Sequence, residues 1–257
     1  MKIKVLGCSG AGFPGRNPPS LLLDGNILFD AGSLTYVLDV KGQLKIKNIF
    51  ITHAHLDHIT GIPFLAENMI SEKRWHPIRI LGIPPVVEAI RKNIFNGSIW
   101  PDFAAIPNAR KPILKFVKLK VGRPIELNGY AITPLKVNHS VPAVGYLVED
   151  QRGRRFFYTG DTGPVDATWE KIAARKIDCL IIEVSFPNRM GKIAIQTGHL
   201  TPQLLRKELL KMNHPPGRVL VTHLKPRYLQ AIRTELQRLH IKNLRLLCDG
   251  ETLRIWR

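Results

Sequence analysis

Short apolar runs alternate with turn-forming residues over most of the chain. Many of these runs are rich in β-branched side chains and are bounded by Gly, Pro, Asn or Asp, which is the pattern of β-strands. We therefore expect strands at residues 3–6, 20–23, 27–29, 46–51, 78–81, 113–119, 130–137, 145–148, 155–158, 179–183, 218–221, 244–247 and 252–256.

Helical periodicity is confined to a few segments between these strands. Residues 84–95, 202–212 and 226–239 each begin with Pro, whose missing N–H is harmless in the first turn of a helix, and residues 165–175 are a fourth candidate. Strands in groups with helices between them predict two packed sheets with helices outside, rather than a doubly wound parallel sheet. The expected fold is a four-layer αββα sandwich of the α/β (α+β) class. No linker is evident, so we expect residues 1–257 to form a single domain.

The chain is strongly basic. Its formal net charge is +18, from 38 Lys and Arg against 20 Asp and Glu, and such a surface attracts polyanions, RNA among them. The basic residues are concentrated at 111–123, 152–155 and 225–245 without forming an uninterrupted tail. Composition alone leaves two interpretations open, a generally basic solvated surface and a nucleic-acid groove.

Neither the N-terminus nor the cysteines indicate an extracellular protein. No apolar stretch approaches the length of a membrane span, and residues 1–7 lack the long apolar core of a signal peptide. Cys8, Cys179 and Cys248 are odd in number and far apart, so they predict neither a disulfide framework nor a cysteine zinc site. We therefore expect a soluble, cytoplasmic protein without a membrane partner.

The first candidate chemistry follows the expected strand at 46–51. Residues 52–58 read T-H-A-H-L-D-H, which places three histidines and an aspartate within six positions. Imidazole nitrogens and carboxylate oxygens are ligands that borderline divalent ions such as Zn²⁺ prefer, and a tight loop after a buried strand can aim them at one point. We predict a metal site formed by His53, His55, Asp57 and His58.

Further candidate ligands stand at the ends of other expected strands. His139, Asp161 and His223 each follow an apolar run, and glycines on both sides of Asp161 would let the backbone approach closely. The candidate ligands are then numerous enough for two metal ions.

These residues resemble the metal ligands of the metallo-β-lactamase superfamily. Its HxHxDH motif is matched by residues 53–58, and its later ligands are matched by His139, Asp161 and His223 in the same order. The resemblance covers almost the whole chain and implies two divalent metal ions, with zinc as the expected metal and manganese or iron as alternatives. One ion would be held by His53, His55 and His139, the other by Asp57, His58 and His223, with Asp161 between them.

Longer segments resemble one branch of this superfamily, the metallo-type 3′,5′-cyclic-nucleotide phosphodiesterases. They are residues 138–147, 183–186, 198–202 and 53–62, although Pro63 and Phe64 depart from the aliphatic continuation of the last segment. The resemblance implies hydrolysis of cAMP or cGMP to the 5′-monophosphate by a hydroxide that bridges the two metals. Asp57 and Asp161 would hold the metals and the nucleophile, and the expected partner is a small cyclic nucleotide.

Ribonuclease Z, the tRNA 3′-processing endoribonuclease of the same superfamily, is the alternative. Glu183 and His199 fall where its glutamate and the histidine of its His-Ser-Thr segment lie, but this chain reads Gly-His-Leu-Thr at 198–201. Ribonuclease Z also carries a long tRNA-binding arm between the ligands that match His139 and Asp161. A pair of strands consumes residues 140–160 here, which leaves no room for an arm.

In either branch the resemblance assigns catalytic roles to Asp57, His199 and Glu183. His199 would protonate the departing oxygen, and Glu183 would orient its ring. The structural alternative is that His199 caps the helix near residue 202 while Glu183 makes an ion pair. A third interpretation of the chain is a basic nucleic-acid-binding protein with vestigial chemistry, which the complete ligand set disfavours. A homodimer is compatible with the sequence, but no sequence feature supports it.

Overall fold

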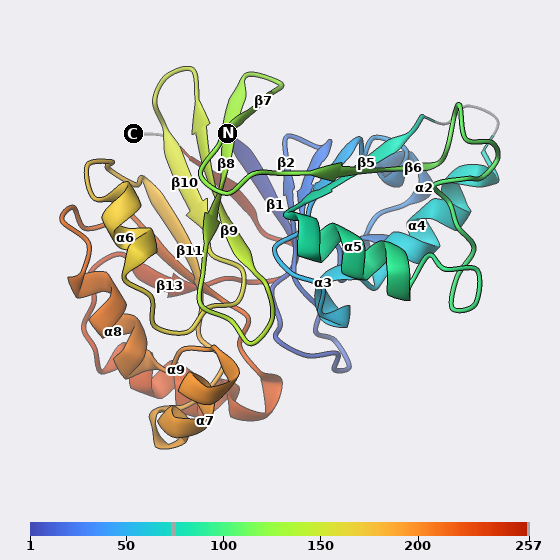
Figure 1. Cartoon of the computed structure of the whole chain (residues 1–257). Coiled ribbons are helices and arrows are strands. Elements are labelled where there is room, and N and C mark those ends of the chain that lie inside the picture. Colours follow the sequence, from blue (N-terminus) through green and yellow to red (C-terminus); the bar gives the residue numbers. More distant parts are fainter. Residues whose placement is uncertain (73–75, 256–257) are drawn as a thin grey trace.

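The computed structural model describes residues 1–72 and 76–255, which contain two seven-stranded sheets (Figure 1). In spatial order, the first sheet consists of β14 (Thr252–Arg254), β1 (Lys2–Gly7), β2 (Ser20–Leu23), β3 (Ile27–Phe29), β4 (Asn48–Phe50), β5 (Ile78–Gly82) and β6 (Leu114–Lys118). The second consists of β13 (Leu244–Leu246), β12 (Val219–Thr222), β11 (Cys179–Glu183), β10 (Arg155–Tyr158), β9 (Val144–Asp150), β8 (Tyr130–Lys136) and β7 (Ile125–Leu127).

Helices lie outside each sheet (Figure 1). The first half of the chain contributes α1 (Leu34–Val37), α2 (Val40–Gln43), α3 (Leu56–Ile59), α4 (Gly61–Ile70) and α5 (Pro84–Asn93). The second half contributes α6 (Ala167–Ile172), α7 (Gly191–Thr197), α8 (Pro202–Leu210) and α9 (Leu229–Gln237), with short 3₁₀ turns η1 (Asn188–Met190) and η2 (Pro226–Tyr228). The predicted αββα sandwich is confirmed. No helix in the described ranges combines the length and hydropathy needed to cross a membrane.

Strand β10 shows how alternating side chains build two packed layers. Phe156 and Tyr158 are buried between the sheets, where the Phe156 ring meets Phe29 of β3 edge-on at 5.7 Å between centroids. Phe157 points the other way and packs against Trp169 of α6. Both faces of the strand are therefore buried, as the two-residue period of a strand allows, and the two sheets share one inner core.

Sequence periodicity does not predict every element. Strand β7 is only three residues long and depends on pairing with β8. Helix α4 begins with Gly61 and has Pro63 in its first turn, a weak start signal, yet it buries residues at the helical spacing that runs from Ile62 to Met69. The helix expected at 226–239 begins instead as η2, and α9 follows it. Residue 256, the last of the strand expected at 252–256, lies outside the described residues.

Several strands end at one edge of the sandwich. In the second sheet, β10, β11 and β12 pair in parallel, and β8 shares their direction because β8 and β10 both run antiparallel to β9. The end of β4 meets the same edge, since the Thr52 carbonyl accepts a hydrogen bond from the Val144 amide at 3.0 Å. Loops on such rigid strand ends can present side chains to one place. This edge is where the predicted ligands converge.

Candidate metal centre

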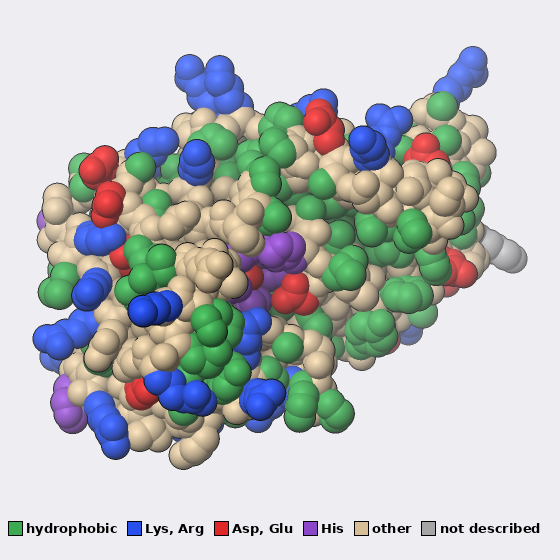
Figure 2. All heavy atoms as spheres, turned by 60° about the horizontal axis from the view of Figure 1, so that its bottom comes forward, with side chains coloured by type: hydrophobic (Ala, Val, Ile, Leu, Met, Phe, Trp, Pro, Cys, Tyr) green, Lys and Arg blue, Asp and Glu red, His purple; other side chains and the backbone are tan. Residues whose placement is uncertain are grey.

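The loop after β4 supplies four of the polar side chains. His53 and His58 are fully buried, whereas His55 and Asp57 are partly exposed. His55 is the N-cap residue of α3, and this short helix carries Asp57 in its first turn and His58 in its last. The helix turns the chain back on itself, so the rings of His53 and His58 lie 4.1 Å apart between centroids. Histidine side chains surface in a hollow on this face of the molecule (Figure 2).

Asp161 lies where the two halves of the chain meet. It follows β10 and is buried. Its Oδ2 atom is 3.7 Å from His53 Nε2 and 3.3 Å from His223 Nε2. Its Oδ1 atom is 3.5 Å from His58 Nε2, and His139 Nε2, from the connection between β8 and β9, is 4.0 Å from Oδ2. With His199, whose Nδ1 atom is 4.0 Å from Oδ2, one carboxylate therefore approaches five imidazole rings.

Two groups of side chains are compact enough to hold a metal ion each, because in each group the ligand atoms lie within 4.8 Å of one another. The groups are His53, His55, His139 and Asp161, and Asp57, His58 and His223. Asp161 and His223 also form a third group with His199. The structure thus brings all seven predicted ligands together, and apart from Asp161, which falls in the first group, they divide as the resemblance implies.

Three buried atoms in this cluster have no hydrogen-bond partner among the described residues. They are His53 Nε2, His58 Nε2 and Asp161 Oδ1. Buried polar atoms are almost always satisfied in folded proteins, so three neighbouring exceptions fit a site that binds divalent ions. Nitrogen and oxygen donors suit the expected zinc as well as manganese and iron.

A buried carboxylate, Asp30, orients His58. Its Oδ2 atom lies 2.8 Å from His58 Nδ1 and accepts a hydrogen bond from the Tyr158 hydroxyl at 2.8 Å. The Thr52 amide and hydroxyl donate to the same carboxylate. Asp30 has a φ of 55°, a left-handed conformation that aspartate tolerates better than most residues. The sequence does not assign Asp30 this role, although residues 29–32 belong to a segment that resembles the superfamily.

Contacts at Nδ1 also orient three other histidine rings of the cluster. The Nδ1 atoms of His53, His139 and His223 lie 3.0, 2.9 and 2.9 Å from the Thr52 hydroxyl, the Gly198 carbonyl and the Ser185 hydroxyl, respectively. The Nε2 atom of each ring is therefore available to bind a metal ion. Such outer partners set the orientation and basicity of metal-binding imidazoles. Ser185 lies in the segment 183–186 that the resemblance singled out, but the sequence does not assign it this role.

The electrostatics favour metal-binding protonation states in most of the cluster, with His58 as an exception because Asp30 and Asp161 raise its pKa. Burial is the main reason that the pKa of His53 is lowered and that the pKa of His139 falls to about 4, so both rings are neutral at pH 7. Burial alone would raise the pKa of Asp161, but the charges of nearby histidines, His223 first, hold it well below its usual range. Asp57 has its pKa lowered by a similar balance. Neutral imidazoles and ionised carboxylates are the forms that bind metals.

A second buried carboxylate, Glu183, orients His199. Glu183 ends β11, and its Oε1 atom lies 2.7 Å from His199 Nδ1. Burial and the charge of Lys225 lower the pKa of His199, but Glu183 and then Asp161 outweigh them and the net pKa is raised. The ring lies beside the cluster, with Nδ1 4.0 Å from Asp161 Oδ2. His199 does not cap α8, because Thr201 occupies the N-cap position and its side chain accepts a hydrogen bond from the helix.

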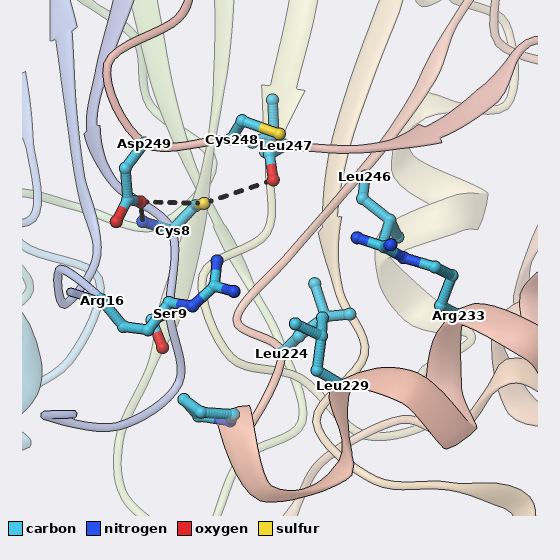
Figure 3. A pocket seen from close by; sticks show the side chains of 11 residues that line it. Cys8, Ser9, Arg16, Leu224, Leu229, Arg233, Leu246, Leu247, Cys248 and Asp249 are labelled. Atoms are coloured by element: carbon cyan, nitrogen blue, oxygen red, sulfur yellow. Dashed lines mark hydrogen bonds between the residues drawn. The ribbon is translucent and has the colours of Figure 1, made fainter. Parts of the chain in front are cut away.

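The loop after β1 packs against His223. A Cβ atom on Gly10 would lie only 2.4 Å from the His223 carbonyl oxygen, so only glycine fits there. Asp249 fixes this loop, because its carboxylate accepts hydrogen bonds from the amide and thiol of Cys8 (Figure 3) and from the amide of Asn17. Burial and the nearby Asp249 charge raise the pKa of the Cys8 thiol. Cys8 is therefore a protonated structural thiol, and all three cysteines are free, as predicted.

Most of the chain matches a known family. Residues 26–224 match the beta-lactamase superfamily domain. The chain belongs to the β-lactamase superfamily. The resemblance inferred from the ligand motif is thus confirmed, and the chain combines the superfamily's metallo-hydrolase fold with a histidine and aspartate cluster able to bind metal ions.

Relatives within the superfamily include two enzyme types. The chain is 31% identical to a 3′,5′-cyclic-nucleotide phosphodiesterase of Aliivibrio fischeri over 70% of its own length and 60% of the relative's length. It is 30% identical to a ribonuclease Z of Methanococcus maripaludis over 89% of its own length and 88% of the relative's. In fold it resembles unliganded yeast PDE1, with a TM-score of 0.84, 20% identity and 98% of both chains covered.

Proposed function

We propose that the protein is a metal-dependent phosphodiesterase that hydrolyses 3′,5′-cyclic nucleotides, cAMP or cGMP, to 5′-monophosphates. In this reaction a water oxygen bonds to phosphorus, the bond between phosphorus and the 3′ oxygen breaks, and a proton passes to the 3′ oxygen. The name of the Aliivibrio fischeri relative supports this substrate class. Because the chain spans only about 60% of that relative, the cyclic nucleotide is part of the proposal.

In this proposal each of the two ligand groups would hold one divalent ion, with Asp161 among the ligands. When bound, such ions supply Lewis acidity at the phosphoryl oxygens and make water a competent nucleophile near neutral pH. The chain itself keeps the ligands rigid. Asp30, Thr52 and Ser185 prevent the imidazole rings from turning, so the site is organised before substrate arrives.

His199 serves as the proton donor to the leaving 3′ oxygen. Its Nδ1 atom is engaged by Glu183, which leaves Nε2 to face the substrate. The buried charge of Glu183 favours the protonated ring before transfer, as a general acid requires. The Ser185 hydroxyl donates to Glu183 Oε2 at 2.8 Å and keeps the carboxylate in place.

The main support for a small substrate is the short connection between His139 and Asp161. Strands β9 and β10 form a hairpin whose turn contains only residues 151–154. Nothing in this connection extends beyond the sheet as a tRNA-binding arm would. Lys and Arg side chains are scattered over the face that bears the histidines (Figure 2), which also suits a small anionic substrate better than a long polyanion groove.

Ribonuclease Z-like RNA cleavage is the second candidate. The net charge of +18 and the match to nearly the full length of the Methanococcus maripaludis relative favour it. That alignment spans 289 positions, more than the 257 residues of this chain. The relative therefore contains residues that this chain lacks, in agreement with the missing arm.

Hydrolysis of cAMP and cGMP by protein reloaded with Zn²⁺ or Mn²⁺ tests the proposal. We expect conversion to the 5′-monophosphates, identified by chromatography, and no conversion by Asp161→Ala. A precursor tRNA should be left intact at its 3′ end. Cleavage of the precursor tRNA without conversion of either cyclic nucleotide would replace the proposal with the second candidate. Less than one metal ion per reloaded chain would instead favour a nucleic-acid-binding protein without hydrolytic activity.

A further inference from the structure

A cation without an acidic partner stands beside the metal cluster. Lys225 follows His223 by two residues and is partly buried. Within residues 1–72 and 76–255, no carboxylate lies within 4.0 Å of its ammonium nitrogen, although its Nζ makes two other contacts. By contrast, the nearby His58 and His199 rings each contact a buried carboxylate. This charge next to the metal ligands is therefore not neutralised by a carboxylate of the described residues.

Two contacts hold the Lys225 ammonium in place. Its Nζ atom lies 5.3 Å from the centre of the Phe186 ring and donates to the Gly10 carbonyl at 3.3 Å. Phe186 is itself fixed between His199 and Tyr228, at 5.6 and 6.1 Å between ring centroids. An ammonium has three N–H donors, and Gly10 accepts only one of them. The side chain is therefore positioned with hydrogen-bonding capacity to spare.

The ammonium is close enough to influence the cluster. The Phe186 ring that its Nζ atom faces also lies 5.6 Å from the His199 ring between centroids, so Lys225 and His199 flank the same aromatic side chain. The residue that accepts its hydrogen bond, Gly10, abuts His223, since a Cβ atom on Gly10 would lie 2.6 Å from His223 Nδ1. Figure 2 shows Lys and Arg side chains around the hollow where the histidines surface. An anionic group in the cluster would thus lie next to a preorganised positive charge.

We propose that Lys225 is a substrate-binding residue that donates a hydrogen bond to a non-bridging oxygen of the phosphodiester. Phe186 and the Gly10 carbonyl position it. This inference rests on the proposed phosphodiester hydrolysis. A charge-assisted hydrogen bond is about twice as strong as a neutral one, and a fixed cation stabilises charge that develops on phosphoryl oxygens. The residue thereby adds phosphate affinity that does not come from the metal ligands.

Titration calorimetry with inorganic phosphate, 5′-AMP and adenosine tests this role in metal-loaded protein. We expect Lys225→Gln to weaken the binding of phosphate and 5′-AMP roughly 10- to 100-fold while leaving adenosine affinity and metal content unchanged. Lys225→Arg, which retains the charge, should keep most of the phosphate affinity. A merely structural role would lower the affinity for adenosine and phosphate alike, together with the unfolding temperature.

Lys41→Gln is the matched control, because Lys41 is exposed on α2 and its loss changes the net charge equally. Phosphate binding by Lys225→Gln that equals that of Lys41→Gln would overturn the inference, and so would a parallel loss of adenosine affinity. Inorganic phosphate tests Lys225 whatever the natural phosphodiester is. A wild-type protein that binds phosphate but leaves cAMP and cGMP intact would refute the proposed substrate without touching the role of Lys225.

Discussion

Two carboxylate and histidine pairs flank the cluster, one in each half of the chain. Asp30 contacts His58 at 2.8 Å, and Glu183 contacts His199 at 2.7 Å. Both carboxylates are fully buried, and each raises the pKa of its histidine although burial opposes that change. The two pairs differ in the surroundings of the imidazole on the side away from the carboxylate. His58 Nε2 is buried without a hydrogen-bond partner among the described residues, whereas the His199 side chain is 10% exposed.

The same pair of groups can therefore serve two purposes. In the first pair, the free nitrogen faces Asp57 and Asp161, so a divalent ion would displace the proton and Asp30 would support a metal ligand. In the second pair, the His199 side chain is partly accessible and Glu183 raises its pKa, as the proposed proton donor requires. Surroundings, rather than the pair itself, distinguish a ligand from an acid.

The largest effect should follow from removing the carboxylate that both pairs approach. Asp161→Ala deletes a group that lies 3.5 Å from His58 Nε2 and 4.0 Å from His199 Nδ1. We expect the metal content to fall and turnover to decrease by at least about 1000-fold, because Lewis acid catalysis is worth several kcal/mol. Elemental analysis and cAMP turnover measure both. Asp166→Ala, at an exposed aspartate next to α6, is the control. Full metal content in Asp161→Ala would exclude this residue from the ligand set.

Removal of the proposed acid should reduce turnover without removing metal. For His199→Ala we expect cAMP hydrolysis to fall by about 10²- to 10⁴-fold, with metal content unchanged. Hydrolysis of bis(p-nitrophenyl) phosphate should fall far less, because p-nitrophenolate leaves without a proton. Steady-state kinetics on the two substrates decide the point. An equal loss on both would mean that His199 does not act as a proton donor.

Neutralising the two carboxylates separately tests the comparison directly. Asp30→Asn should weaken zinc binding by about 10- to 100-fold and lower the free energy of unfolding by about 1–3 kcal/mol, since Thr52 and Tyr158 lose a charged acceptor. Glu183→Gln should leave zinc affinity nearly unchanged and reduce turnover instead. Zinc competition titrations, urea unfolding and cAMP kinetics measure these effects. If both variants lost zinc affinity equally, the two pairs would have the same purpose.

The smallest effect should follow from removing the Ser185 hydroxyl. This group links Glu183, the partner of the proposed acid, to the candidate metal ligand His223. Ser185 Oγ lies 2.8 Å from Glu183 Oε2 and 2.9 Å from His223 Nδ1. Ser185→Ala leaves the bond between Glu183 and His199 intact, so we expect roughly a tenfold loss of turnover, the lower end of the value of a hydrogen bond to a charged group. Ser71→Ala, at an exposed serine that ends α4, is the control. A loss as large as that of His199→Ala would give Ser185 a direct part in proton transfer.

The fold and the cluster of candidate ligands could be predicted from the sequence, because both depend on local patterns of residues. A strand followed by histidines and an aspartate within six residues can be recognised without knowledge of the rest of the chain. The prediction of close backbone approach near Asp161 is also confirmed, since a Cβ atom on Gly160 would lie 2.7 Å from Thr52 side-chain atoms. The assignment of metals, proton donor and substrate to these residues stays a prediction.

By itself, then, the sequence determined the two-sheet sandwich and the strand ends that carry the candidate ligands, because alternation and loop spacing are properties of neighbouring residues. Only the tertiary structure decided which groups support them. Asp30 is 28 residues from His58, Ser185 is 38 residues from His223, and Gly10 is 215 residues from Lys225. Each of these contacts forms where strands distant in sequence end at one edge, and no local pattern of side chains records that proximity.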